Sequence, residues 1–335
     1  NEPRIDFLND SKGALKLEPS RSNLFLYSES LETGWTGAGT NPPVLTASQF
    51  ISPDGSQDAS RLQIPSTGTT SIFYQLFSHT IGTQYTISAY VKSNTSTNQE
   101  FKLYGDFGAP TGISGVLTAT NEWQRFSFTY TATATGSRSG GFYYVPNTAA
   151  DLQVYGIQVE VGSYSTSFVP TQGATATRVA ETCNGAGNDQ VFNDSEGVIY
   201  VETQPFIDGD FTSVYISLSD NTTGNNFITI QHRDSGQLRI YAGNFTTIIY
   251  LVNIDMSENL KIALQYENIT DFKLYVNGIS YPIYSTPTNS AFVGLNTFDF
   301  KLRGSASGYW LGQVKEAKYF NTALTDQQLI SLTKI

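Results

Sequence analysis

The chain has 335 residues and a formal net charge of -10, with 14% charged and 13% aromatic residues. This length predicts two domains of roughly 150 residues each, and the many Phe and Tyr residues argue against disorder. The negative charge excludes a nucleic-acid partner, because phosphate binding needs a basic face, and favours a neutral or cationic partner such as an uncharged glycan. No apolar run approaches the roughly 20 residues that span a bilayer, so no membrane insertion is expected.

The first part of the chain is interpreted as an arm followed by short strands. Residues 1–16 have few apolar side chains and no period, and the sequence does not decide whether they pack on a neighbouring chain. From Ala59 onward, alternating or aromatic-rich runs are separated by Gly, Pro, Asn and Thr, which is typical of a sandwich or jelly roll. The predicted strands cover residues 59–64, 71–77, 84–93, 100–107, 123–132, 141–145 and 151–161.

The stretch from Gly156 to Arg178 marks the boundary between two β units. Ile157, Val159 and Val161 alternate with Gln158 and Glu160, which predicts a strand with two different faces. The small-residue run that follows ends in a proline, which cannot continue a central strand. We therefore predict a first domain over residues 17–178 and a linker over residues 179–194.

The second half repeats the strand pattern and ends in a helix. Strands are predicted over residues 197–206, 211–220, 226–234, 237–243, 260–267, 271–281, 298–304 and 310–320. Asn277-Gly278 suits a tight hairpin turn. Thr325 is a suitable N-cap for a short amphipathic helix with Leu329 and Ile330. The predicted fold class is therefore all-β, with two tandem β-sandwich (jelly-roll) domains, the second over residues 195–335, and a short C-terminal helix.

The carboxylates do not form a catalytic pattern. Glycoside hydrolysis needs two carboxylates across a sugar site, but here they are scattered, and Glu202 in the sequence Glu-Thr-Gln lacks the rest of a Glu-x-Asp-x-Glu strand. Two His residues are too few for a His-based zinc site, and Cys183 is the only thiol. We therefore do not expect an enzyme.

Aromatic residues on strands suggest sugar binding, because a flat ring fits the apolar face of a pyranose. In the first half consecutive aromatics must place some rings on the outer face, and the candidates are Tyr74, Tyr104 and Tyr143, with Gln75 and Arg61 as polar partners. The alternative is that these side chains close the edge of the core.

In the second half, a hairpin over residues 231–241 would bring several candidate sugar-binding residues to one edge. These residues are His232, Arg233, Asp234 and Tyr241, and Trp310 is a further candidate on the rim. The alternatives are a polar hairpin tip and, for Trp310, a core strand.

Two sequence patterns resemble known families. The first pattern consists of Glu18, Pro19, Arg21, Asn23, Leu24, Tyr27-Ser-Glu and Trp35, together with the stretch from Gln158 to Arg178. It resembles a jelly roll of the carbohydrate-binding-module type found in tail-fibre and surface proteins of bacterial viruses. Residues 273–278 (Lys-Leu-Tyr-Val-Asn-Gly) and 312–325 resemble the laminin-G/concanavalin-A-like sandwich. Ser22 and Gln328 depart from the usual Thr and acidic residue.

These resemblances imply a function on a virion surface. They imply a non-catalytic fibre or receptor-binding protein that binds host cell-surface polysaccharide, contacts other virion proteins and forms a homo-oligomer, with a trimer favoured. They also imply structural Ca²⁺, a hard cation that prefers oxygen ligands, with the candidates Glu18, Asp151, Glu160, Asp208 and Asp210. Two alternatives remain open: a structural capsid, head-fibre or tail protein without a ligand, and an ancillary module of a carbohydrate-active enzyme.

Overall fold

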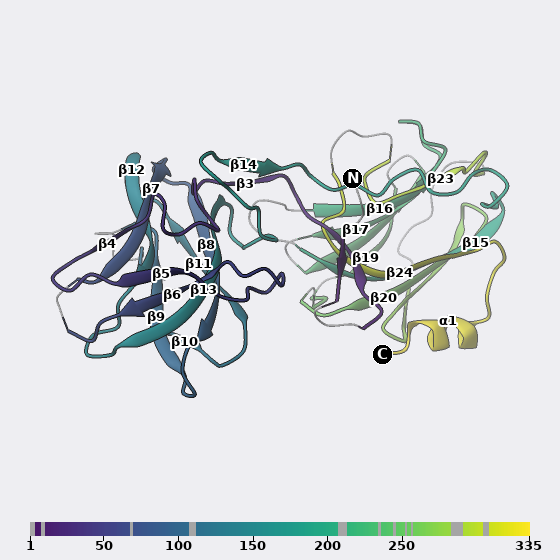
Figure 1. Cartoon of the computed structure of the whole chain (residues 1–335). Helices are drawn as coiled ribbons and strands as arrows, with labels where there is room; N and C mark the ends of the chain where they lie inside the picture. Colours follow the sequence, from purple (N-terminus) through teal and green to yellow (C-terminus); the bar gives the residue numbers. More distant parts are fainter. Residues whose placement is uncertain are drawn as a thin grey trace. The chain divides into compact units, whose positions relative to one another are not determined.

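The computed structural model describes residues 4–7, 11–67, 70–106, 112–206, 213–233, 236–243, 246–251, 253–255, 257–282, 291–303 and 308–335. This part of the chain consists of antiparallel strands and one short helix (Figure 1), which confirms the predicted all-β class. The chain divides into two compact units. We call Ser20–Val179 the inserted unit, and we call Asn1–Pro19 together with Ala180–Ile335 the split unit.

The inserted unit is a sandwich of two five-stranded sheets. The first sheet has the order β10 (Leu117–Ala119), β9 (Gln99–Tyr104), β12 (Gly136–Tyr143), β7 (Ile72–His79) and β4 (Thr36–Ala38). The second has the order β11 (Gln124–Thr131), β8 (Gln84–Ser93), β13 (Ala150–Val161), β6 (Ala59–Ile64) and β5 (Val44–Phe50). A separate pair, β3 (Arg21–Asn23) with β14 (Ala176–Arg178), joins the two ends of the unit.

The core of the inserted unit follows directly from strand alternation. Phe73, Phe142 and Leu103 are register partners on three neighbouring strands of the first sheet, and all three are buried. They pack in one cluster with the apolar side chains of the second sheet, such as Ile87 and Val91. Because successive side chains point to opposite faces, the residues between them on the first sheet point away from this core.

A bulge interrupts the longest strand of the inserted unit. The register of β13 against β8 shifts between Tyr155 and Gln158, and Gly156 there has a φ of +59°. Glycine adopts this left-handed conformation without a steric penalty, and bulges with glycine are common in antiparallel pairs. After the bulge Ile157 and Val159 face the core, whereas Gln158 is buried on the opposite face.

The split unit is a second sandwich with its own core. Its seven-stranded sheet has the order β1 (Ile5–Asp6), β2 (Ala14–Leu17), β24 (Gly312–Phe320), β15 (Glu196–Pro205), β20 (Leu260–Glu267), β21 (Asp271–Val276) and β22 (Ile279–Tyr281). Its five-stranded sheet has the order β19 (Thr246–Leu251), β18 (Gln237–Ala242), β17 (Phe227–Arg233), β16 (Ser213–Ser219) and β23 (Thr297–Asp299). Buried aliphatic side chains of both sheets form one cluster.

The predicted arm belongs to this second sandwich. Leu15 and Leu17 on β2 pair with Val314 and Gly312 on β24, and β1 continues the sheet beyond β2. Leu17 is buried in the core of the split unit. Residues 1–19 therefore supply two strands to the same sheet as the C-terminal part of the chain, and the inserted unit interrupts the split unit between β2 and β15.

The chain leaves and re-enters the split unit at one place, which we call the neck. Glu18 N–H donates to the Glu181 carboxylate at 2.9 Å, and Glu181 N–H donates to the Glu18 carbonyl at 3.0 Å. The guanidinium of Arg4 donates to both carboxylates, with 2.6 Å between Nη2 and Glu18 Oε2. Since Glu18 is 1% exposed, this pairing supplies the partner that a buried carboxylate requires.

The predicted hairpin and helix are both confirmed. Asn277 and Gly278 have φ values of +51° and +81° and connect β21 to β22, as a type I′ turn requires. Helix α1 (Asp326–Thr333) begins after the N-cap Thr325, whose side chain accepts a hydrogen bond from Gln328 N in a capping box. No helix in the ranges described above is long and apolar enough to cross a membrane.

Candidate functional site

Three tyrosines lie on the outer face of the first sheet of the inserted unit. Tyr74 on β7 and Tyr104 on β9 are both register partners of Gly141 on β12, and Tyr143 lies two residues further along β12. All four positions alternate with the core residues of their strands, so they share the face opposite the core. We call these residues the tyrosine face. The structure thus brings together the three tyrosines that the sequence predicted.

Gly141 lies between Tyr74 and Tyr104 in the sheet and is itself buried. It has a φ of +151°, and a Cβ there would lie 2.2 Å from the Phe73 carbonyl oxygen, so no other residue fits without a shift. Strands lie about 4.8 Å apart in a sheet, so the strands carrying Tyr74 and Tyr104 are separated by roughly twice that distance. Gly141 therefore places no side chain between the strands that carry Tyr74 and Tyr104.

The three rings differ in exposure. Tyr104 is fully buried, and its ring meets that of Tyr143 edge to face, with 5.7 Å between ring centroids. Tyr143 and Tyr74 are half-buried, and Tyr143 also packs against Tyr144 with 5.0 Å between centroids. Burial raises the pKa of Tyr104 and of Tyr143 above the usual value. Both phenols therefore remain neutral hydrogen-bonding groups at physiological pH.

Two polar residues of this face were not among the predicted site residues. Lys102 on β9 is the register partner of Tyr143, and Ser139 on β12 lies two residues before Gly141 on the same face. Both are half-buried. Strand alternation in residues 100–104 and 136–143 could have identified them. Lys102 lies two positions from Tyr104, and Ser139 lies two positions from Gly141, so each pair shares a face.

The two predicted polar partners lie elsewhere. Gln75 is 4% exposed and on the core face of β7, where its side-chain amide oxygen Oε1 accepts a hydrogen bond from Leu26 N–H. Arg61 lies on β6 in the second sheet and binds Asp151 in a bidentate ion pair, with 2.9 and 2.6 Å between nitrogen and oxygen. Adjacent residues on a strand face opposite ways, which explains why Gln75 does not accompany Tyr74.

The residues predicted for the split unit do not form one edge. His232 and Trp310 are both fully buried, and their rings meet edge to face with 4.9 Å between centroids. Burial lowers the pKa of His232 to about 3. The structure therefore places both rings in the core instead of on a binding surface. For Trp310, this is the core position that the sequence left open as the alternative.

The remaining members of that predicted group lie on the other face of the same sheet or outside the described ranges. Arg233 on β17 donates to Gln237 Oε1 at 3.2 Å, and Arg239 donates to that oxygen and to the Tyr241 hydroxyl, each at 3.2 Å. Arg233 and Tyr241 are thus linked through two side chains of β18. Asp234 lies outside the residues that the structure describes.

The predicted metal ligands are dispersed, and those described already have protein partners. Glu18 pairs with Arg4 and Lys16, and Asp151 pairs with Arg61. Glu160 is fully buried and accepts from Gln158 Nε2, Thr166 N and Thr166 Oγ1 at 2.6–2.8 Å. Asp208 and Asp210 lie outside the described residues.

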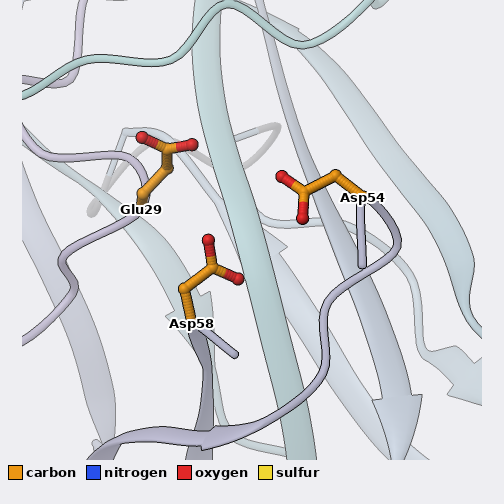
Figure 2. A group of neighbouring side chains, drawn as sticks. All are labelled: Glu29, Asp54 and Asp58. Atoms are coloured by element: carbon orange, nitrogen blue, oxygen red, sulfur yellow. The ribbon is translucent and has the colours of Figure 1, made fainter. Parts of the chain in front are cut away.

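A different set of acidic residues converges in the inserted unit (Figure 2), and we call it the acidic triad. Glu29, Asp54 and Asp58 each have a carboxylate oxygen within 4.8 Å of the others. Asp54 and Asp58 flank the turn between β5 and β6, and Glu29 follows β3. The sequence places Asp54 and Asp58 in one turn, but the proximity of Glu29 depends on strand pairing.

One hydroxyl serves two carboxylates of the triad. Tyr155 Oη lies 2.6 Å from Asp54 Oδ2 and 3.1 Å from Glu29 Oε1, but it has only one proton to donate. Hydrogen bonds from Tyr155, Ser56 N–H and Ser52 lower the pKa of Asp54 to about 2. Asp58 Oδ1 is buried without a hydrogen-bond partner among the described residues. This all-oxygen, acceptor-rich set fits Ca²⁺, which takes oxygen ligands at 2.3–2.6 Å.

We expect Ca²⁺ to stabilise the inserted unit through the acidic triad. At about tenfold excess over its dissociation constant, an ion that binds only the folded state adds about 1.4 kcal/mol, which raises the Tm of a unit this size by roughly 3–5 °C. Calorimetry of the full chain with Ca²⁺ and with a chelator measures this shift. Asp58→Asn should abolish it, whereas Asp189→Asn in the split unit should not. An equal Ca²⁺ shift in the Asp58→Asn variant would contradict the assignment.

No family model and no curated protein matches the sequence. Among solved structures, the chain is similar to the CBM40 module of a Ruminococcus gnavus sialidase, with 15% identity and a TM-score of 0.36 over 46% of this chain and 97% of that one. It is also similar to a SAP-like pentraxin from Limulus polyphemus, with 11% identity and a TM-score of 0.36 over 45% of this chain and 74% of that one. For the NanB sialidase of Streptococcus pneumoniae the identity is 14% and the TM-score 0.33, over 45% of this chain and 27% of that one.

Proposed function

We propose that this chain is a non-catalytic protein that binds carbohydrate through the tyrosine face. The observation that carries the proposal is the arrangement of Tyr74 and Tyr143, two half-buried rings on neighbouring strands of one outer sheet face. Aromatic rings recognise the apolar face of a sugar, and a few placed polar groups fix its orientation. Lys102 and Ser139 supply such groups on the same face.

The charge of the chain supports a neutral glycan as the ligand. The formal net charge is -10, and a strongly acidic protein repels polyanions at long range. Lys102 is the register partner of Tyr143, and its ammonium can donate to sugar hydroxyls but offers only one positive charge. An uncharged polysaccharide is therefore the ligand class that this face suits best.

We further propose that the chain acts on the surface of a bacterial virus and binds host cell-surface polysaccharide as a fibre or receptor-binding protein. The support is the sequence resemblance over Glu18 to Trp35 and Gln158 to Arg178. A homotrimer and contacts with other virion proteins belong to the same proposal. Immunogold labelling of purified particles with an antibody against the chain tests this location, and absence of label from intact particles would contradict it.

Tyr143→Ala is expected to weaken glycan binding by roughly 30-fold, or about 2 kcal/mol, because a central aromatic contact is lost. Tyr143→Phe should retain most of the affinity, since the ring remains. The measurement is a glycan array of bacterial surface polysaccharides, followed by calorimetric titration of the best ligand.

Tyr90→Ala provides the matched control for this test. Tyr90 is also half-buried, but it lies on β8 in the second sheet, where it packs beneath Arg125. Its removal should cost comparable stability and leave binding unchanged. If Tyr90→Ala and Tyr143→Ala weaken binding equally, or if no glycan binds, the tyrosine face is not the site.

A further inference from the structure

The split unit has an open groove beside its C-terminal helix, which we call the helix groove. Its volume is about 620 Å³, within the usual range for ligand sites. One wall is the outer face of β15 and β24, and the other is α1, which packs over this sheet through Leu329. All of its lining residues belong to the split unit, so the helix groove is separate from the tyrosine face.

Two carboxylates face each other in this groove. Glu202 on β15 and Glu316 on β24 are direct register partners. Side chains at such positions have Cβ atoms about 4.5–5.5 Å apart, and like charges there destabilise the sheet. The register shifts immediately after this pair, because Thr203 pairs with Val314 and leaves Lys315 as an extra residue. Such bulges turn side chains and are frequent beside binding sites.

Each of the two carboxylates contacts one neighbouring polar group. Lys318 Nζ lies 2.6 Å from Glu316 Oε1, and the Tyr200 hydroxyl hydrogen-bonds to Glu202. Burial, together with the charges of Glu202 and Glu316, raises the pKa of Tyr200, so its phenol stays neutral and donates. Each carboxylate has further lone pairs for a ligand, because one carboxylate accepts about four hydrogen bonds.

The floor of the groove is apolar and partly aromatic. Tyr200 is 2% exposed and belongs to the cluster beneath α1, and Phe320 and Leu324 pack against the same cluster while lining the groove. Lys318 Nζ lies 5.7 Å from the centre of the Tyr200 ring. The accessible apolar surface next to the charged groups therefore comes from Phe320 and Leu324, which are half-buried.

The helix side of the groove adds polar groups. Gln328 Oε1 accepts from Thr325 N and Thr325 Oγ1 at 2.9 Å in the capping box, so the oxygen is occupied. The side-chain NH₂ group of Gln328 has no hydrogen-bond partner among the residues that the structure describes, so it can donate to a ligand. Ser331 lines the groove one helical turn further along α1.

We propose that the helix groove binds a neutral saccharide. Acceptors (Glu202 and Glu316) and donors (Lys318 and Gln328) surround an apolar floor, which matches the alternating hydroxyl and C–H faces of a sugar. Three lysines and two glutamates line the groove. The lysines disfavour a divalent cation, and the glutamates disfavour a phosphate or sulfate group. The chain would then have a second saccharide site, on a different unit from the tyrosine face.

The test uses the full chain and a defined set of probes, namely the neutral hexasaccharides of maltose, cellulose, laminarin and chitin type. Each is titrated calorimetrically against wild type, Glu202→Gln, Glu316→Gln and Phe320→Ala, with Asp271→Asn, at an exposed position on β21, as a matched control. We expect at least one probe to bind wild type and to bind each groove variant at least tenfold more weakly. Asp271→Asn should bind like wild type.

Two further measurements keep this proposal distinct from the tyrosine face and from a structural role. Tyr143→Ala should leave groove binding unchanged, whereas a parallel loss would assign the binding to the inserted unit. Glu202→Gln should keep or raise the Tm, because it removes a like-charge contact. A role in stability alone would lower the Tm and leave binding intact. Absence of binding by every probe, or equal binding by wild type and both glutamine variants, overturns the proposal.

Discussion

Lowering the pH from about 7.5 to about 4.5 is expected to cost the split unit about 3 kcal/mol of unfolding free energy through His232 alone. The ring of His232 is fully buried against Trp310, and burial lowers its pKa to about 3. Neither ring nitrogen has a hydrogen-bond partner among the residues that the structure describes. The imidazolium would therefore be both desolvated and uncompensated in the folded state.

The direction of this effect follows from the two pKa values. In the unfolded chain His232 has a pKa of about 6.5, well above its value of about 3 in the folded chain. Below pH 6.5 the unfolded state therefore binds a proton that the folded state excludes. The stability that the neutral ring supplies is fully present above the unfolded pKa, and it is lost as the pH falls from about 6.5 toward 3.

His232→Leu should remove this part of the acid sensitivity. The measurement is amide hydrogen exchange of β16, β17 and β18 as a function of pH, because these strands surround position 232 and report the stability of the split unit. Exchange in the inserted unit provides the internal control, because His232 lies outside that unit and its pH dependence should be the same in wild type and in His232→Leu. An identical pH dependence in wild type and His232→Leu would show that another group governs acid unfolding.

Glu160→Gln is expected to destabilise the inserted unit by about 3 kcal/mol, because it breaks a buried charged network. The carboxylate accepts from Gln158 Nε2 at 2.8 Å and from Thr166 N at 2.7 Å through one oxygen, and from Thr166 Oγ1 at 2.6 Å through the other. Arg21 Nε lies 3.9 Å from that second oxygen. An amide has the same shape, but its NH₂ cannot accept from these donors.

Calorimetry and chemical denaturation of the full chain measure this loss in the transition of the inserted unit. Glu122→Gln is the matched control, because Glu122 is exposed in the same unit. Its effect should remain within about 0.5 kcal/mol. A loss below about 1 kcal/mol for Glu160→Gln would mean that the network reorganises around the amide.

Strand alternation and turn chemistry account for what could be predicted from sequence. The hairpin at Asn277-Gly278 and the helix after Thr325 depend on residues close together in the chain, and both are found where expected. The outward tyrosines follow from the same local rule, because Phe73 and Phe142 must face the core.

The features that could not be predicted depend on pairing between strands that are far apart in the sequence. Alternation tells which residues of one strand share a face, but not which strands share a sheet, and so Arg61 lies on the other sheet from Tyr74. The acidic triad needs Glu29 beside the turn that carries Asp54 and Asp58, which no local pattern indicates. Residues 1–16 lack a clear period because their strands are very short, and their partner β24 lies at the opposite end of the chain.

At the neck, the two ends of the inserted unit lie close together. Glu18 and Glu181 hydrogen-bond to each other in the split unit, and Arg21 and Arg178 are register partners in the inserted unit. Each unit therefore has its own pairing where the chain passes from one to the other. Replacing residues 20–179 with another domain whose two ends lie as close together is therefore expected to keep the contacts of Arg4, Glu18 and Glu181.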